Sequence, residues 1–336
     1  TVFDHGLGQA TKAAAGIISP WFSKRRNKAW YHMARLGADF YQELTSNLEN
    51  DGYDTSFYDQ SGVVLLKKDD GKLDGLYQYA ETRLEESPII GELSIKNADE
   101  LPKFTGFDRC LYASGGARVE GAELTATLIE ASGFEKLEGL VTLSSLNNET
   151  YEINAQTFDK VILACGAWLG QTLEPLGFEV DVRPQKGQLR DYFFEGLDTG
   201  KLPVLMPEGE LDIIPFAGGK ISVGASHEND KGFDLTVDEA VLEGLEEEAK
   251  IYFPGLSTAK SFSERVGTRA YTSDFSPFFG EVPELKNVFV ASGLGSSGLT
   301  TGPLIGKNLV DLVMNRSGSL DSTDYPVTQY VKKKDQ

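Results

Sequence analysis

The sequence predicts an open α/β fold whose parallel sheet is interrupted by an antiparallel one, and three segments carry this prediction. Residues 287–310, NVFVASGLGSSGLTTGPLIGKNLV, read as a buried strand, a glycine loop and a helix. Residues 161–170, VILACGAWLG, repeat the order of apolar strand and small-residue turn, and Phe3 with Asp4 closes another apolar strand. Since strand ends of an open α/β sheet converge on one crevice, these turns predict a ligand site where they meet.

The glycine loop after the strand at 288–290 lets the backbone approach a flat or anionic ligand. Gly293, Gly295 and Gly298 carry no Cβ, and they match the dinucleotide-binding pattern GxGxxG. That pattern also expects an acidic residue about 20 positions further on, and Asp311 comes too early, within helical sequence. A close-packed strand-to-helix turn therefore stays open beside a ligand loop.

The remaining elements follow from apolar spacing and turn residues. Helices are expected at 27–48, 72–86 and 123–131, and strands at 61–67 and 159–164. Residues 184–194 read as an exposed strand, and 212–215 and 220–224 as paired antiparallel strands around the turn 217–219. A long helix is expected to begin at Thr236, with Glu239 completing a capping box, and to end at Pro254.

Length and charge limit the function. A chain of 336 residues is long for one core, so two domains are expected. The formal net charge of −19 argues against a nucleic-acid surface, which needs clustered Lys and Arg, and favours a small-molecule ligand. The basic cluster Lys24, Arg25, Arg26 and Lys28 is the local exception, either as a solvated helix start or as an anion-attracting rim near the site.

Cysteine and histidine usage predicts neither a disulfide framework nor a metal site. Cys110 and Cys165 are the two cysteines, and neither belongs to a CxxC pair, which favours a reducing, cytoplasmic compartment. With His5, His32 and His227 besides, no set of ligands has the spacing of a metal site. No apolar run approaches the roughly 20 residues that span a bilayer, so no membrane span is expected.

Five motifs in order carry a family resemblance over nearly the whole chain: QATKAAAGIISP (9–20), ACGAW, PQKGQL, GTRAYTSDFSPFFG and GLGSSGLTTGPLIG. Together they resemble the FAD-dependent D-amino-acid oxidase superfamily, near its glycine oxidase, sarcosine oxidase and D-amino-acid dehydrogenase branches. The resemblance implies a Rossmann-like FAD-binding domain of the glutathione-reductase type. That domain is expected to be discontinuous, over 1–52, 106–180 and 264–336, with an α+β antiparallel-sheet substrate domain at 53–105 and 181–263.

One departure concerns the start of the chain. Proteins of that superfamily open with a strand, a GxGxxG turn and a helix, followed by a strand that ends in an acidic residue. Asp4 lies where the resemblance places that acid, which binds the adenosine ribose. The expectation is therefore a chain that lacks the first βαβ unit.

The resemblance also assigns the cofactor contacts. Residues 11–16 would line the phosphates and the flavin edge, Ile17, Ile18 and Ser19 would lie beside the ring, and Val141 would contact adenine. The full set of expected FAD-binding residues is Asp4, His5, Gln9, Ala10, Thr11, Lys12, Ala14, Ala15, Gly16, Ile17, Ile18, Val141, Ala164, Gly166, Trp168, Gly293, Gly295, Ser296, Ser297, Gly298 and Leu299. Thr268 and Ala270 flank Arg269 where some relatives carry a flavin-linked cysteine, so FAD is expected to bind non-covalently.

Arg269, Asp212 and Ser19 are the residues expected at the reaction. Arg269 matches the arginine that holds the substrate carboxylate, and a guanidinium suits that role because it offers a bidentate fork. Asp212 stands where the glycine oxidase branch has a substrate-contacting tyrosine, and Ser296 where it has a second arginine, which weighs against glycine or sarcosine as substrate. Asp212 either pairs with a cationic group on a larger substrate or is a solvated strand residue.

The implied reaction is oxidation of the C–N bond of an amino acid or secondary amine by hydride transfer to flavin N5, followed by hydrolysis of the imine. Oxygen or an electron carrier would reoxidise the flavin. The alternatives left open are an FAD-dependent opine or D-amino-acid dehydrogenase with a non-oxygen acceptor, and a catalytically silent fragment or binding protein. The oligomeric state is also open.

Overall fold

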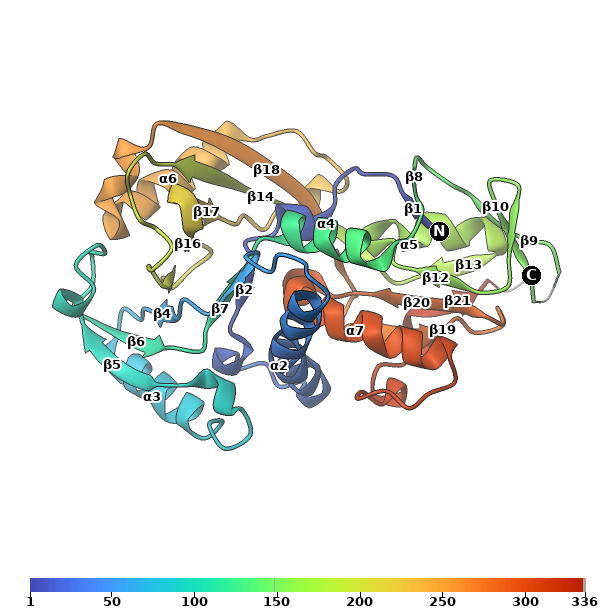
Figure 1. The fold of residues 1–336 in the computed structure, drawn as a ribbon, viewed down its shortest axis with the longest axis horizontal. Helices are drawn as coiled ribbons and strands as arrows, with labels where there is room; N and C mark the ends of the chain where they lie inside the picture. Colours follow the sequence, from blue (N-terminus) through green and yellow to red (C-terminus); the bar gives the residue numbers. More distant parts are fainter. Residues whose placement is uncertain (148, 335–336) are drawn as a thin grey trace.

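An eight-stranded mixed sheet forms one side of the molecule in the computed structural model, which describes residues 1–147 and 149–334 (Figure 1). Its long antiparallel strands lie at one edge and its shorter strands at the other. In order across the sheet they are β18 (Ser261–Tyr271), β14 (Arg183–Phe193), β17 (Lys220–Gly224), β16 (Asp212–Phe216), β15 (Val204–Met206), β4 (Val63–Leu65), β6 (Arg109–Ala113) and β5 (Leu93–Asn97). The hairpin predicted at 212–224 is confirmed, with β16 and β17 antiparallel around residues 217–219.

Smaller sheets make up the rest of the molecule. β12 (Val161–Leu163) pairs in parallel with β20 (Val288–Ser292), and β19 (Phe278–Glu281) joins β20 antiparallel. β1 (Val2–Asp4) pairs in parallel with β8 (Lys136–Glu138). The further short strands are β9 (Leu143–Ser145), β10 (Tyr151–Ile153), β11 (Gln156–Phe158), β13 (Phe178–Val180) and β21 (Val331–Lys333), and β2 (Ile17–Ile18), β7 (Ala117–Val119) and β3 (Tyr58–Asp59). The three strands on which the α/β prediction was based, β1, β12 and β20, are present, and each has a parallel partner.

Two long helices, α2 (Lys28–Asn50) and α7 (Gly298–Val313), lie side by side in the middle of the molecule (Figure 1). Gly37 permits this contact, because a Cβ there would lie 2.3 Å from the Thr300 carbonyl oxygen. The buried Tyr41 hydroxyl donates to the Leu299 carbonyl oxygen at 2.6 Å. The contact therefore fixes the first turn of α7, which the glycine loop precedes.

The other helices are α1 (Ala10–Ala13), α3 (Asp70–Glu81), α4 (Gly121–Ser132), α5 (Leu169–Leu173), α6 (Glu239–Tyr252) and α8 (Val327–Tyr330). Within the described residues, none of the helices combines the length and apolar character that crossing a bilayer requires.

Two local predictions were wrong. The strand at 184–194 is not exposed: residues 185–192 of β14 are buried or nearly so, because β17 and β18 flank the strand and α6 contacts it. Helix α6 begins at Glu239, and the capping box does not form. Thr236 instead donates to Asp234 Oδ1 at 2.8 Å, while the Glu239 carboxylate accepts from Arg190 Nη2 at 2.5 Å.

The division into two domains stays a prediction. One strand bears on its boundaries: β6 lies in the 106–180 segment expected in the cofactor domain, yet it is hydrogen-bonded between β4 and β5 of the eight-stranded sheet.

Candidate active site

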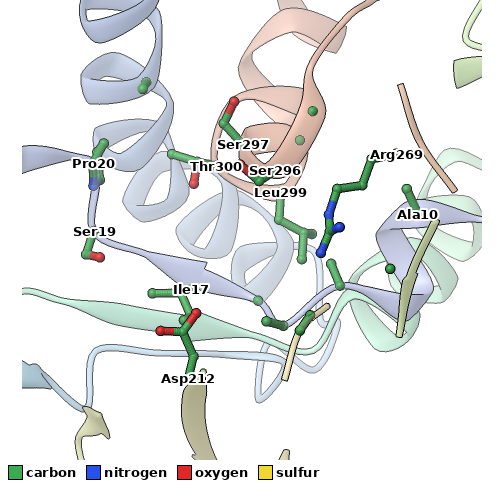
Figure 2. A pocket seen from close by; sticks show the side chains of 18 of the residues that line it. Ala10, Ile17, Ser19, Pro20, Asp212, Arg269, Ser296, Ser297, Leu299 and Thr300 are labelled. Atoms are coloured by element: carbon green, nitrogen blue, oxygen red, sulfur yellow. The ribbon is translucent and has the colours of Figure 1, made fainter. Parts of the chain in front are cut away.

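A cavity of about 460 Å³ opens where the eight-stranded sheet meets the first turn of α7. This volume is typical of small-molecule sites. Figure 2 shows residues of the 10–20 segment, the α7 turn and the sheet facing the same space. The cavity brings together fourteen of the predicted site residues: Ala10, Thr11, Ala14, Ala15, Gly16, Ile17, Ser19, Asp212, Arg269, Gly295, Ser296, Ser297, Gly298 and Leu299.

The 10–16 segment lies close to β18 because both sides are small. A Cβ on Gly267 would lie 2.7 Å from the Ala13 Cβ, and one on Gly16, where φ is +86°, would lie 2.0 Å from the Val119 carbonyl oxygen. The Arg265 guanidinium on β18 then fastens the segment, since Nη1 donates to the carbonyl oxygens of Lys12 at 3.1 Å and Ala14 at 3.2 Å.

Arg265 is itself held by buried acids. Its Nη2 donates to Asp191 Oδ1 at 2.9 Å and to the Ser222 hydroxyl at 3.0 Å, and Glu120 lies 3.5 Å from Nη1. Lys220 bridges Glu120 and Asp191. We call Asp191, Arg265, Lys220, Glu120 and Ser222 the charged network; it holds the 10–16 segment against the sheet.

The first turn of α7 lines the cavity with residues 298–300. Among the described residues it has no side-chain cap, because the Ser297 hydroxyl donates to the Leu294 carbonyl oxygen at 2.8 Å instead. Gly295 has φ of +54°, and a Cβ there would lie 2.2 Å from Tyr271 Cε1. An uncapped helix start of this kind favours an anionic or electron-rich ligand edge.

Arg269 reaches the cavity from β18 with part of its guanidinium unused. Nη1 donates to the Ser226 carbonyl oxygen at 2.8 Å and to Gln185 Oε1 at 3.1 Å. In the described part of the chain, Arg269 forms no ion pair with a carboxylate. Burial lowers the pKa of Arg269 and outweighs the more distant charges of Glu210 and Glu228, which oppose this shift. A ligand carboxylate would supply a counterion.

Asp212 enters the cavity from β16 (Figure 2). Burial raises the pKa of this carboxyl to about 8, with no contribution from a neighbouring charge. Of the two interpretations of Asp212, its place in the cavity wall favours contact with a ligand over a purely solvated strand residue.

Two further cavity residues were missed by sequence reasoning. His227 follows β17, and burial, together with the positive charge of Arg269, lowers its pKa. Met206 ends β15 and accepts a hydrogen bond from the Ser19 hydroxyl at its sulfur, 3.6 Å away. Neither stands in a local motif; the pairing of β15, β16 and β17 brings both to the cavity.

Ten predicted cofactor residues lie outside the cavity: Asp4, His5, Gln9, Lys12, Ile18, Val141, Ala164, Gly166, Trp168 and Gly293. Asp4 accepts from Gln9 Nε2 at 2.8 Å on both oxygens. Burial opposes its ionisation, but hydrogen bonds from the Gly6 N–H and from Lys136 outweigh that effect and lower the pKa of Asp4. Trp168 packs against Phe233, with ring centroids 4.9 Å apart. Of the basic cluster, Arg25 reaches the cavity wall, where its guanidinium lies over the Trp30 ring.

Comparisons with known proteins identify the family of this chain. The family of FAD-dependent oxidoreductases, DAO, matches residues 1–312. An uncharacterized oxidoreductase of Bacillus subtilis, YurR, is 37% identical over 95% of this chain and 89% of its own length. A glycine oxidase of Pseudomonas aeruginosa is 29% identical over 94% of this chain and 88% of its own. The crystal structure of iminodiacetate oxidase from Chelativorans sp. BNC1 superposes with a TM-score of 0.90 and 29% identity, covering 98% of this chain and 91% of that one.

Proposed function

Since this chain belongs to the DAO family of FAD-dependent oxidoreductases, we propose that it oxidises the C–N bond of an amino acid or secondary amine. The observation that carries the proposal is Arg269, a partly buried guanidinium in the cavity wall without a carboxylate partner among the described residues. Such a group suits the carboxylate of an amino acid, whose Cα–H would then be held in one orientation.

The cavity fits the flavin that the family implies. The residue at 295 must be a glycine for the loop to pass Tyr271, and the uncapped first turn of α7 offers N–H groups to an electron-rich ring edge. We place residues 10–17 along one side of the ring and 295–299 along its pyrimidine end. Apart from Ile18, which was predicted beside the ring, the predicted residues outside the cavity would serve the rest of the dinucleotide, and binding would be non-covalent.

When bound, the flavin supplies the electron-accepting chemistry. The chain's own part is to hold the substrate. Arg269 binds the carboxylate, and the Ser226 carbonyl and Gln185 keep the guanidinium in place. His227, with a lowered pKa, stays neutral beside Arg269 at neutral pH, so it adds no second cation to this end of the cavity.

The relatives suggest where to look for the substrate. Glycine and iminodiacetate are in the names of two of them. We propose a substrate of the same class, with a carboxylate next to the oxidised C–N bond. Either oxygen or an electron carrier would take the electrons from the reduced flavin.

The test is the visible spectrum of the FAD-loaded protein, recorded anaerobically before and after adding glycine, sarcosine, iminodiacetate, D-amino acids and opines. A flavin spectrum that bleaches with one of these amines is expected. Oxygen uptake during turnover would then identify an oxidase, and its absence with turnover on an artificial acceptor would identify a dehydrogenase. A protein that retains no flavin, or a flavin that no amine reduces, would overturn the proposal.

A further inference from the structure

The cavity has opposite charges on two of its walls. Arg269 enters from β18, and Asp212 enters from β16 on another side (Figure 2). The two groups are far enough apart that Arg269 contributes nothing to the pKa of Asp212. A ligand whose carboxylate is on Arg269 therefore has to extend across the cavity to reach Asp212.

The strands around Asp212 give its carboxyl no partner. On one side its register partner is Gly224, and on the other side lies Met206, because β15 and β16 pair through Leu205 and Ile213. A glycine and a thioether bring no hydrogen-bond donor. In the described part of the chain, no side chain or backbone N–H is hydrogen-bonded to this carboxyl, and its pKa responds to burial alone.

Other acids near this cavity are paired. Asp191, 4% exposed, contacts Arg265, Lys220 and Ser222, and the partly buried Glu228, which follows β17, accepts from Gln188 and Ser226 through Oε1. A partly buried carboxylate without a partner carries a desolvation cost, and a ligand cation would remove it. Asp212 thus has the properties of a ligand-binding acid.

We propose that Asp212 binds an ammonium or guanidinium group at the far end of the substrate from the carboxylate that Arg269 holds. The inference rests on the proposed function and narrows its substrate class. The substrate would carry a carboxylate at one end, the oxidised C–N bond near it, and a second basic group on the remote arm.

A remote carboxylate fits less well than a cation. The other charged or titratable side chains of the cavity are Arg25, His227 and Arg269. Arg25 lies over the Trp30 ring, and Arg269 and His227 lie together at the other end. A substrate carboxylate placed beside Asp212 would therefore lie next to another carboxyl group, with no cation to pair with it.

Three six-carbon ligands test the proposal in the FAD-loaded protein: 6-aminohexanoate, hexanoate and adipate. They share the carboxylate for Arg269 and differ only in the far end, which is an ammonium, a methyl or a carboxylate. None has an amine next to its carboxylate, so dissociation constants can be read from the flavin absorbance and from calorimetry without turnover. We expect 6-aminohexanoate to bind roughly tenfold or more tightly than either of the others.

Asp212→Asn is the matched variant. It should abolish the preference for 6-aminohexanoate while changing the affinity for hexanoate by about twofold or less. Proton release on binding can be measured by calorimetry in two buffers of different ionisation enthalpy. At neutral pH the wild type should release up to roughly one proton when it binds 6-aminohexanoate, because Asp212 must ionise. The variant should release none. Glu247→Gln removes an exposed carboxylate from α6, away from the residues that line the cavity, and should keep the preference.

Equal affinity for the three ligands, including no binding by any of them, would overturn the inference, and so would a preference for adipate or a preference that survives in Asp212→Asn. These outcomes are distinct from failure of the proposed function, which shows as a flavin that no amine reduces.

Discussion

Two arginines on strand β18 show how the same side chain serves structure in one place and ligand binding in another. Arg265 and Arg269 lie four residues apart, so they are on the same face of the strand. Arg265 donates to two carbonyl oxygens, an aspartate and a serine. Arg269 has two neutral acceptors and no carboxylate partner among the described residues. The arginine that has its counterions holds the chain together, and the one that lacks them is available to a ligand.

The acids of the same sheet repeat the contrast. Asp191 on β14 belongs to the charged network, whereas Asp212 on β16 faces the cavity with a raised pKa. Asp191 is almost fully buried and Asp212 only partly, and their partners also differ: Asp191 contacts two cations and a hydroxyl, whereas Asp212 has no hydrogen-bond partner in the described part of the chain. Four substitutions test this difference.

Arg265→Ala should have the largest effect. It leaves Asp191 with fewer partners in a buried setting and releases the 10–16 segment, so we expect the free energy of unfolding to fall by about 3–4 kcal/mol. Urea unfolding measures it, with Arg316→Ala at an exposed position as the control. A loss no greater than that of the control would mean that the charged network does not hold the segment.

Arg269→Ala should act on catalysis and leave stability nearly unchanged. We expect the substrate to be oriented less well and KM to rise, so that the transition-state stabilisation measured by kcat/KM falls by about 3 kcal/mol. The free energy of unfolding should change by less than about 1 kcal/mol. Arg269→Lys keeps the positive charge but loses the bidentate geometry of the guanidinium, so its kcat/KM should lie between those of the wild type and Arg269→Ala. The assignment fails if steady-state kinetics give a kcat/KM close to the wild-type value.

Asp212→Asn should raise stability in a pH-dependent way. The folded-state pKa, about 8, lies above the ordinary value of 3.8, so the folded state binds the proton more tightly than the unfolded chain. The wild type therefore loses stability as pH rises from about 4 to about 8, and the variant is spared this loss. We expect equal stability near pH 4 and an advantage for the variant that grows as the pH rises toward 8, measured by thermal unfolding. An advantage that does not depend on pH would contradict this reason.

Gln185→Ala should have the smallest effect. Gln185 accepts from Arg269 and donates to Asn229 Oδ1 at 2.6 Å, so its loss loosens the guanidinium without removing it. We expect KM to rise by about fivefold, roughly 1 kcal/mol, with kcat changed far less. Steady-state kinetics measure both parameters. A change in kcat alone would show that Gln185 acts on something other than substrate binding.

Local patterns predicted the elements that depend on neighbouring residues in the sequence. The helix expected at 27–48 and the strands at 161–164 and 288–290 are present because apolar spacing sets them. The capping box at Thr236 failed because the Glu239 carboxylate has a stronger partner, Arg190, on a strand that is distant in sequence. No pattern within a short window contains that contact.

The residues of the site also fall into those that a local motif predicts and those that only strand pairing brings together. Ordered motifs predicted the 10–17 segment, the 295–299 loop and Arg269, and the cavity brings these together. Met206 and His227 were missed because they reach the cavity through the pairing of β15, β16 and β17. The partners of Arg265 were beyond prediction for the same reason, since they come from four separate parts of the chain.

The contact of Gly37 with Thr300 limits how the enzyme can be redesigned. Because α2 permits no added atom there, the α7 wall of the cavity cannot move without disturbing the packing in the middle of the molecule. On the sheet side of the cavity, Met206 and Asp212 are strand residues and His227 follows β17, so their side chains can be exchanged while the sheet backbone stays in place. A library aimed at new substrates should therefore vary positions 206, 212 and 227 and leave the helical wall as it is.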